Sequence, residues 1–411
     1  MPRHFHPGFI HGCLALALIG AAPPRTPLIG RELELAQLTR LFANGNTPLV
    51  TITGPGGVGK TRVALAAGSA VADRQRDGGV FVPLAPVADW RQAPAAMAHA
   101  AGLRDKPDQS AANQLREYLQ QRAMLLVLDN LEQVTGIAPY LSDLLRACPG
   151  LRLLVTSRRP LHVQEEQEFP LEPLPLPDTA EASPTSLLAE NAAVRLFVQR
   201  SQAVRPDFVL TDANAKAISE ICHRLDGLPL AIELGAARSR LLPPAALLAR
   251  LDARLALLTR GGPDRPGRHQ TMRDAIAWSY DLLSSHEQMV FRTLSVFPGG
   301  VTLDAVEAMV RPSPGSGATT PVATLDTVTS LVDASLLRMV RESGDEPRFA
   351  MLQTIREFGL EQLQACGETA GAAERQAHYF LQFAEAAAAS QRGSGQVAHL
   401  AALETERENL R

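Results

Sequence analysis

The stretch that decides the fold runs from Leu49 to Thr61 and reads LVTITGPGGVGKT. Its first five residues are apolar or β-branched, which predicts a buried strand. Residues 54–61 fit the pattern GxxxxGK[ST], and apolar residues at helical spacing follow them. A strand, a glycine-rich loop and a helix in this order are typical of a phosphate-binding loop. The sequence therefore predicts a P-loop that binds a nucleoside phosphate.

The residue types of this loop suit a polyphosphate. Glycines allow positive φ, so that backbone N–H groups turn toward the phosphates beside the positive end of a helix. Lys60 is expected to reach the β- and γ-phosphates, and the Thr61 hydroxyl to ligate Mg²⁺. The dinucleotide pattern GxGxxG also fits, but it has no use for Lys60 and Thr61. The candidate nucleotide-binding residues here are Gly54, Pro55, Gly56, Gly57, Val58, Gly59, Lys60, Thr61 and Arg62.

Alternation of strands and helices continues on both sides of the loop. Further apolar runs at residues 80–84, 124–129, 151–156 and 168–171 predict strands, and helical patterns lie near 60–73, 91–102, 109–121 and 136–147. This order indicates a parallel sheet with helices on both faces. The predicted fold class is an α/β P-loop NTPase followed by an all-α domain, a winged helix and the start of a TPR-like helical repeat region.

Two more strand ends carry candidate catalytic residues. Asp129 ends a buried run and is expected to hold Mg²⁺ as a Walker B aspartate. Asn130 stands where many ATPases have a second acid, so Glu132 is the nearest substitute, or else a first-turn glutamate favoured by the helix dipole. ATP hydrolysis is therefore expected to be slow. Arg158 follows the next strand and either senses a γ-phosphate or lies in a solvated loop.

Breaks in periodicity divide the chain. Proline recurs between residues 170 and 177, and glycine and proline cluster between 261 and 267. Three helical patterns followed by two short strand-like runs, 336–340 and 348–351, are the order of a winged helix. We expect an N-terminal tail or linker at 1–25, a nucleotide-binding domain at 26–178, a helical domain at 179–260, a winged helix at 261–352, and the start of a C-terminal repeat region at 353–411, with helices at 374–389 and 396–411, that is truncated here.

Composition excludes some classes of function. The 411 residues are 45% hydrophobic and 20% charged with a net charge of -3, which excludes a disordered chain and gives no global attraction to nucleic acid or an acidic membrane. The four cysteines form no CxxC pair, so a cytoplasmic protein is expected. Residues 12–22 resemble the apolar region of a signal peptide, but they also suit a linker or an extension before the true start. About 11 residues are too few to span a bilayer.

Several motifs occur in the order found in one group of ATPases. The chain resembles STAND ATPases of the NB-ARC (AP-ATPase) type over residues 26–411. A later motif, residues 354–358 (TIREF), is similar to the bacterial branch, the LuxR-type and SARP-type transcriptional regulators. The motifs that carry the resemblance to NB-ARC are residues 28–32 (LIGRE), the P-loop, 128–132 (LDNLE), 156–158 (TSR) and 227–231 (GLPLA).

The resemblance implies roles for individual residues. Ile29, Gly30 and Arg31 would lie against the adenine and ribose of ATP or ADP, and Pro229 would pack on the adenine. The P-loop would hold the phosphates, Asp129 the Mg²⁺ and Arg158 the γ-phosphate. Many relatives have a Met-His-Asp motif whose His contacts ADP, whereas residues 351–353 here read MLQ. Because Leu352 cannot donate a hydrogen bond, the winged helix must close by other contacts or close less tightly.

Three functions are compatible with these features. The first is a switch: ADP holds a compact state, and exchange for ATP, triggered by an inducer or a protein partner on the C-terminal helices, opens it and permits homo-oligomerisation. DNA would then be bound only through a domain outside this chain, with no role for a membrane.

The second function is an ATPase that remodels a partner by repeated turnover. The third is direct DNA binding by the winged helix. Its basic patch would be Arg265, Arg268, His269 and Arg273. The near-neutral charge, and the expected packing of the winged helix on the nucleotide, disfavour the third function.

Overall fold

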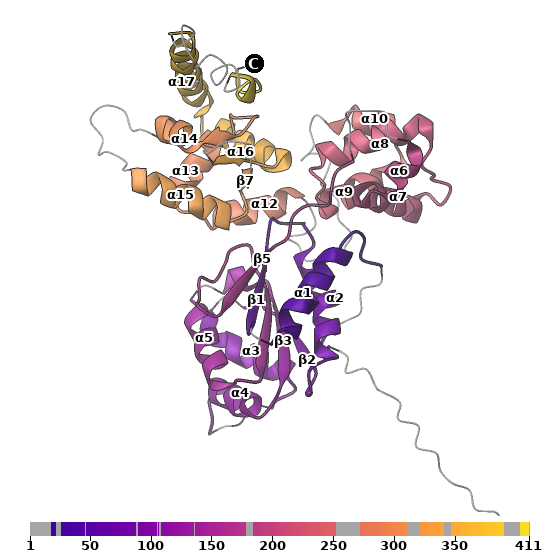
Figure 1. Ribbon diagram of the computed structural model, residues 1–411, viewed down its shortest axis with the longest axis vertical. Coiled ribbons are helices and arrows are strands. Elements are labelled where there is room, and N and C mark those ends of the chain that lie inside the picture. Colours follow the sequence, from indigo (N-terminus) through magenta and orange to yellow (C-terminus); the bar gives the residue numbers. More distant parts are fainter. Residues whose placement is uncertain are drawn as a thin grey trace, which may run out of the picture.

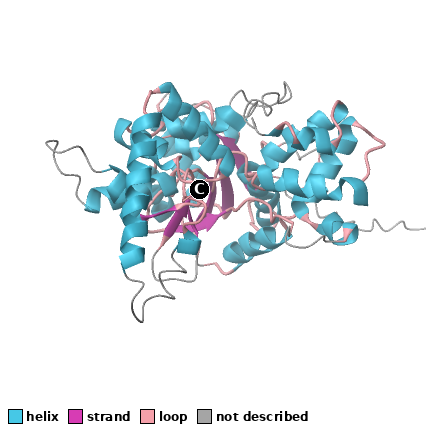
Figure 2. Cartoon of the chain, turned by 90° about the horizontal axis from the view of Figure 1, so that it is seen from above, coloured by secondary structure: helices cyan, strands magenta, loops and turns pink. Residues whose placement is uncertain are grey.

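Three groups of elements make up the molecule. The computed structural model describes residues 18–21, 26–45, 47–87, 89–104, 106, 108–134, 136–177, 184–251, 272–310, 321–340, 347–389 and 403–410. Figure 1 shows an α/β domain at the bottom of the view, with a helical group (α6 to α10) and a winged-helix group (α12 to β8) above it. In Figure 2, seen from above, helices of these two groups form two lobes.

A five-stranded parallel sheet forms the centre of the first domain, as the sequence predicts. The strand order is β2-β3-β4-β1-β5. Strands β1, β3 and β4 have the predicted bounds, whereas β2 begins one residue and β5 two residues earlier than expected. The strands are β1 Leu49–Thr53, β2 Gly79–Pro83, β3 Met124–Asp129, β4 Leu151–Thr156 and β5 Glu166–Pro170.

Helices cover both faces of this sheet. Along β3, Leu125 and Val127 belong to one hydrophobic core, and Leu126 and Leu128 belong to the other, because successive side chains of a strand point to opposite faces. The first core includes α1 Glu32–Ala43 and α2 Lys60–Ala72. The second includes α3 Ala93–Ala100, α4 Ala111–Gln120 and α5 Ala138–Ala147.

Residues 18–21, within the segment expected to be a tail or linker, lie along the sheet edge. Ile19 forms a parallel bridge with Val80 of β2, and its N–H group donates to the Gly79 carbonyl oxygen at 2.9 Å. Leu18 is 5% exposed and joins the first core. These residues therefore extend the hydrogen bonding of β2 beyond the five strands.

The second group is helical, as predicted. Asn191 caps α7 by accepting from the N–H groups of Ala193 and Val194 at 3.0 and 3.2 Å. Phe197 of α7 is fully buried and meets Phe208 edge to face. The helices are α6 Thr185–Glu190, α7 Ala192–Val204, α8 Asp212–Arg224, α9 Pro229–Ala236 and α10 Pro244–Leu248.

The third group begins with α12, and then α13 to α15 and a hairpin follow in the predicted order of a winged helix. A short strand that the sequence did not indicate, β6, joins the hairpin in a three-stranded sheet of order β6-β8-β7. The predicted strand at 336–340 starts only at Arg338, because the N–H groups of Leu336 and Leu337 both bond to the Leu331 carbonyl oxygen and end α15. The elements are α12 Met272–Asp281, α13 Ser285–Leu294, β6 Val301–Thr302, α14 Leu303–Val310, α15 Pro321–Asp333, β7 Arg338–Val340 and β8 Arg348–Ala350.

Helices α16 Gln353–Ala365 and α17 Thr369–Ala389 follow, so α17 begins five residues before the predicted helix at 374–389. Of the helix predicted at 396–411, only 403–410 are described, and helix at 403–405 changes to turns at 406–409. This segment packs on the winged helix. Arg348 of β8 donates to both carboxylate oxygens of Glu406 at 2.6 and 2.9 Å, and Asn409 donates to the Gly300 carbonyl oxygen at 2.8 Å. None of the helices in the described ranges has the length and apolarity that crossing a membrane requires.

Candidate nucleotide-binding site

A cavity of about 280 Å³ lies where β1, β3 and β4 end. Carboxyl ends of parallel strands share one edge of a sheet, which is where open α/β sheets bind ligands. Most of the predicted site residues meet there. The walls are made of Gly56, Gly57, Gly59, Lys60, Thr61, Arg62, Asn130, Glu132, Arg158, Pro229, Leu230 and Glu233.

Glycine is required at several points of the P-loop. Gly54, Gly57 and Gly59 have φ values of +142°, +82° and +102°, which side chains rarely adopt. A Cβ atom at Gly54 would also lie 2.6 Å from the Leu171 carbonyl oxygen. Gly59 immediately precedes α2, so the loop presents the N-terminus of that helix to the cavity.

Lys60 is folded under the loop. Its side chain is 8% exposed, and Nζ donates to the carbonyl oxygens of Gly54 at 2.5 Å and Pro55 at 3.0 Å. The pKa of Lys60 is lowered to about 8, mainly by burial and also by the charge of Arg158, while the carboxylates of Glu132 and Asp129 oppose the shift. A phosphate beside Nζ would reverse this shift by stabilising the ammonium.

The two predicted magnesium ligands are in contact. Thr61 Oγ1 donates to Asp129 Oδ1 at 2.8 Å, and Thr156 Oγ1 donates to the same oxygen at 2.6 Å. Burial raises the pKa of Asp129, while these two hydrogen bonds oppose the rise. A hydroxyl and a carboxylate beside a phosphate site are oxygen donors of the kind that Mg²⁺ takes. Thr61 and Asp129 therefore fit the predicted magnesium site.

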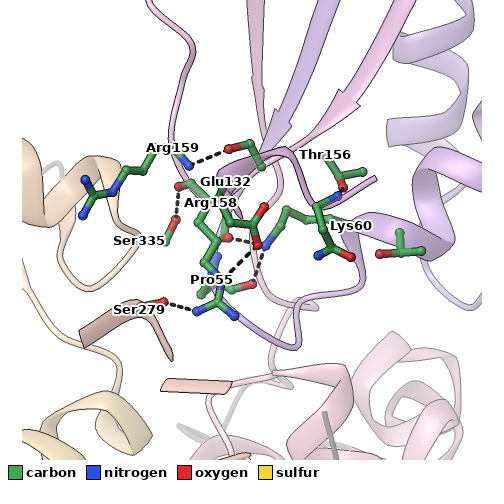
Figure 3. Close-up of polar contacts among 12 residues, drawn as sticks. Pro55, Lys60, Glu132, Thr156, Arg158, Arg159, Ser279 and Ser335 are labelled. Atoms are coloured by element: carbon green, nitrogen blue, oxygen red, sulfur yellow. Dashed lines mark hydrogen bonds and ion pairs between the residues drawn. The ribbon is translucent and has the colours of Figure 1, made fainter. Parts of the chain in front are cut away.

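Glu132 and Arg158 form a buried ion pair on the cavity wall. Arg158 Nε lies 3.3 Å from Glu132 Oε1, and the side chains are 4% and 3% exposed (Figure 3). The alternative of a solvated loop for Arg158 is therefore wrong. Asn130 adopts φ +65° and donates its N–H to Thr156 Oγ1 at 2.9 Å, which turns the chain sharply before Glu132. Glu132 Oε2 is buried without a hydrogen-bond partner among the described residues, so it can accept from a water in the cavity.

Arg158 also contacts the winged-helix group. Its Nη1 donates to Ser279 Oγ of α12, and its carbonyl oxygen accepts from Ser335 Oγ at 3.1 Å (Figure 3). A second cavity of about 380 Å³ lies on this side, and Leu352 is among its lining residues. Arg158 lines both cavities. One guanidinium thus connects the nucleotide cavity to the winged helix.

The remaining residues implied by the resemblance are placed differently. Pro229 lines the nucleotide cavity, whereas Ile29 lines a separate cavity of about 290 Å³. Gly30 packs so closely that a Cβ atom would lie 2.2 Å from Ala192 Cβ. Arg31 is 3% exposed and donates to the Val58 carbonyl oxygen at 3.3 Å, so it supports the P-loop. Adenine contacts of Ile29, Gly30 and Arg31 stay predictions.

A carboxylate of the helical group contacts the start of α16. Asp226, directly before residues 227–231, accepts from the N–H groups of Gln353 at 3.0 Å and Thr354 at 2.9 Å. It also accepts from Thr354 Oγ1 at 2.9 Å. These are the first residues of α16, so Asp226 of the helical group caps a helix that follows the winged helix. Asp226, Ser279 and Glu233 were not predicted from the sequence, although Glu233 lies one helical turn after Pro229.

The basic patch proposed for DNA is mostly outside the described residues, which include neither Arg265, Arg268 nor His269. Arg273 is described, and its Nη1 donates to Glu361. Helix α15, the third helix of the winged helix, reads PVATLDTVTSLVD and has no Lys, Arg or His. Lysine and arginine supply the electrostatic attraction to DNA phosphates, and α15 does not supply it.

A P-loop and a strand-end aspartate beside it, on a parallel sheet, define a P-loop ATPase fold. Residues 27–287 match the AAA ATPase domain family, and residues 283–364 match a winged helix-turn-helix domain. The chain therefore belongs to the AAA ATPase domain family and carries a winged helix-turn-helix domain.

Two kinds of relatives occur in Mycobacterium tuberculosis H37Rv. A protein provisionally named an HTH-type transcriptional regulator is 38% identical over 367 residues, 88% of this chain and 39% of the relative. The chain thus spans about two fifths of the length of that relative. An uncharacterized protein is 34% identical over 345 residues, 84% of this chain and 83% of the relative.

Solved structures show more distant likeness. The Aeropyrum pernix ORC2 protein, solved in ADPNP and ADP complexes, has a TM-score of 0.44 at 14% identity, over 84% of this chain and 96% of that one. A STAND protein with a tetratricopeptide repeat sensor from Pyrococcus horikoshii has a TM-score of 0.33 at 15% identity, over 92% and 50%. Such scores support no functional argument.

Proposed function

We propose that this chain is the nucleotide-dependent switch of a transcriptional regulator, compact with ADP and opened by ATP. The observation that carries the proposal is Arg158, which lines the nucleotide cavity and donates to Ser279 of α12. Bound ADP and ATP differ at the γ-phosphate. The predicted γ-phosphate sensor is therefore also a contact between domains.

The chemistry of the switch follows from competition for one guanidinium. Arg158 bonds to Glu132 and Ser279 in the described state. A γ-phosphate near Lys60 would attract Arg158 through charge-assisted hydrogen bonds, which are stronger than a bond to a neutral hydroxyl. ATP would thus weaken the contact with Ser279, and ADP would leave it in place.

One contact is not enough for a complete switch. Moving a population from 1:99 to 99:1 takes a differential binding energy of about 5.5 kcal/mol. Other polar contacts join the winged helix and α16 to the rest of the chain and supply further increments: Asp226 with α16, and His162 with Asp333 at 3.1 Å. We propose that release of Arg158 loosens these contacts together. Mg²⁺ held by Thr61 and Asp129 would fix the triphosphate in place.

Further proposals concern how the switch would act on transcription. The winged helix acts as an intramolecular domain, because α15 has no cation, and DNA is bound through a domain outside this chain. The transcriptional-regulator relative supports this output. The NB-ARC class, the LuxR or SARP type, the domain bounds given above, an inducer on the C-terminal helices and nucleotide-driven homo-oligomerisation belong to the same proposal.

A second candidate is an ATPase that remodels a partner by repeated turnover. The buried Oε2 of Glu132, which has no hydrogen-bond partner in the part of the chain that the structure describes, favours it, since such an oxygen can orient an attacking water. Turnover separates the two functions. Many ATP hydrolysed per second would support the remodelling ATPase, and retained ADP with slow turnover would support the switch.

The test of the switch uses the nucleotide content of the purified protein and the variant Arg158→Ala. We expect ADP to be released on denaturation. The variant should lose about tenfold more affinity for a non-hydrolysable ATP analogue than for ADP, as calorimetry would measure. Equal losses for the two nucleotides would contradict the sensor role of Arg158.

A further inference from the structure

A carboxylate lines the nucleotide cavity on the side of Arg62. Glu233 of α9 is 12% exposed, and its Oε1 lies 3.1 Å from Arg200 Nη2 and 3.6 Å from Arg62 Nη1. Glu132, the other glutamate of the cavity wall, is paired with Arg158 instead. The cavity thus has two separate acidic positions, one beside Arg158 and one beside Arg62.

The position of Glu233 relative to the phosphates is fixed. The Leu230 N–H donates to the Gly57 carbonyl oxygen at 3.1 Å, which ties the start of α9 to the P-loop. Pro229 and Glu233 are four residues apart, so they share one face of α9, and both line the cavity. The backbone of Glu233 therefore lies about one helical turn, roughly 6 Å along the axis, beyond that of Pro229.

Two arginines hold this carboxylate in place. Arg62 Nη2 donates to the carbonyl oxygens of Thr26 at 2.8 Å and Pro27 at 2.9 Å, and Arg200 Nη2 donates to Thr26 Oγ1 at 3.1 Å. Both guanidiniums thus bind Glu233 and the segment before α1. A carboxylate that is anchored in this way is held in one position at the cavity wall.

An ionised carboxylate only accepts hydrogen bonds, so the groups of a nucleotide that Glu233 can bind directly are hydrogen-bond donors and not phosphate oxygens. Arg62, which pairs with Glu233, directly follows the phosphate-binding residues Lys60 and Thr61. The sugar is bonded directly to the α-phosphate, so we expect it to be the next part of the nucleotide on this side. Ribose has two adjacent hydroxyl donors, and an acidic side chain that accepts from ribose hydroxyls is a known solution in dinucleotide sites. We infer that Glu233 accepts hydrogen bonds from the ribose hydroxyls of the bound nucleotide and so selects ribonucleotides over deoxyribonucleotides.

This inference rests on the proposed nucleotide site and deepens it. Calorimetry with Mg²⁺ would compare ADP, 2′-deoxy-ADP, 3′-deoxy-ADP and IDP on the whole chain. We expect the wild-type protein to bind ADP about tenfold more tightly than at least one deoxy analogue, the size of a hydrogen bond to a charged group. Glu233→Gln should lower ADP affinity to the level of that analogue and leave the affinity of the analogue unchanged. Glu220→Gln, on the surface of α8, is the matched control and should retain the tenfold preference.

Other outcomes would overturn the inference. Equal wild-type affinity for ADP and both deoxy analogues would exclude ribose recognition while leaving the nucleotide site intact. Equal losses for ADP and the deoxy analogues in Glu233→Gln would show that the carboxylate only anchors Arg62 and Arg200. A preference for ADP over IDP that Glu233→Gln alone removes would assign the carboxylate to the adenine amine. Absence of binding by any of the nucleotides would refute the proposed function itself.

Discussion

The nucleotide-binding domain meets its two neighbours through different kinds of contact. Its boundary with the helical group includes backbone hydrogen bonds beside the ion pair of Arg62 with Glu233: the Leu230 N–H donates to the Gly57 carbonyl oxygen, and the Leu174 N–H to the Gly227 carbonyl oxygen at 2.9 Å. Its boundary with the winged helix is made of side chains, such as Arg158 with Ser279. Backbone contacts do not depend on ionisation or on a ligand, whereas a guanidinium changes partners when an anion arrives. We therefore expect the helical group to stay with the P-loop while the winged helix moves.

The largest effect is expected at the backbone boundary. Gly227 has φ +64°, and a Cβ atom there would lie 2.3 Å from the Leu174 carbonyl oxygen. Gly227→Ala should lower the free energy of unfolding by about 3 kcal/mol, from strain in φ and from the clash. Urea denaturation would measure this change in the free energy of unfolding. Gly102→Ala is the control, because Gly102 has φ +77° with nothing near, and it should cost only about 1 kcal/mol. Similar costs for both variants would show that the boundary is not tightly packed.

The next effect is expected at the cap of α16. Asp226 has φ +54°, which Asn tolerates, so Asp226→Asn removes charge without backbone strain. Weaker hydrogen bonds to Gln353 and Thr354 should lower the free energy needed to separate α16 from the helical group by about 2 kcal/mol. Amide hydrogen exchange in α16 should become faster, while the exchange rates in β3 of the central sheet should stay the same. Asp143→Asn, at an exposed ion pair, is the control. Faster exchange throughout the chain would contradict a local role.

The affinity of the P-loop for nucleotide should depend on pH through the protonation of Lys60. The pKa of Lys60 is lowered to about 8 by burial, and a bound phosphate raises it, so binding requires the ammonium form. Affinity for ADP should fall nearly tenfold between pH 7.5 and 9, as calorimetry would show. In the absence of nucleotide, the free energy of unfolding should depend on pH in the opposite direction. Between pH 8 and 10.5 Lys60 is protonated in the unfolded chain but not in the folded chain, so the free energy of unfolding should rise with pH in this range. Constant ADP affinity across this range would show that Lys60 stays charged.

The smallest effect is expected at Ser279. Ser279→Ala removes one hydroxyl acceptor from Arg158 and leaves the nucleotide cavity intact. The ratio of ATP-analogue affinity to ADP affinity should rise by about fivefold, because Arg158 becomes easier to draw to the γ-phosphate. Ser142→Ala, on α5 in the α/β domain, is the control. A ratio that does not change would break the proposed link between this boundary and the nucleotide.

Patterns within one element were predictable from the sequence, and contacts between elements were not. The P-loop, Asp129 and the central strands follow from local spacing, since a strand or a glycine turn is decided by its own residues. Thr61 meets Asp129 because the P-loop that leads into α2 follows β1, and β1 and β3 end at the same edge of the sheet. Asp226 and Ser279 carry no such signal, because their partners are more than 100 residues away in sequence. Glu233 has a signal in its spacing from Pro229, but the spacing does not reveal the pairing with Arg62.

Arg348 connects the winged helix to the C-terminal residues 403–410. It lies on the central strand of the small sheet, bonds to the carbonyl oxygens of Gly299 and Gly300, and holds Glu406 through two hydrogen bonds. The strand that bears it ends at Ala350, and α16, which Asp226 caps, begins at Gln353. A load applied to residues 403–410 is therefore transmitted through a rigid strand to the start of α16, over only a few residues of covalent chain.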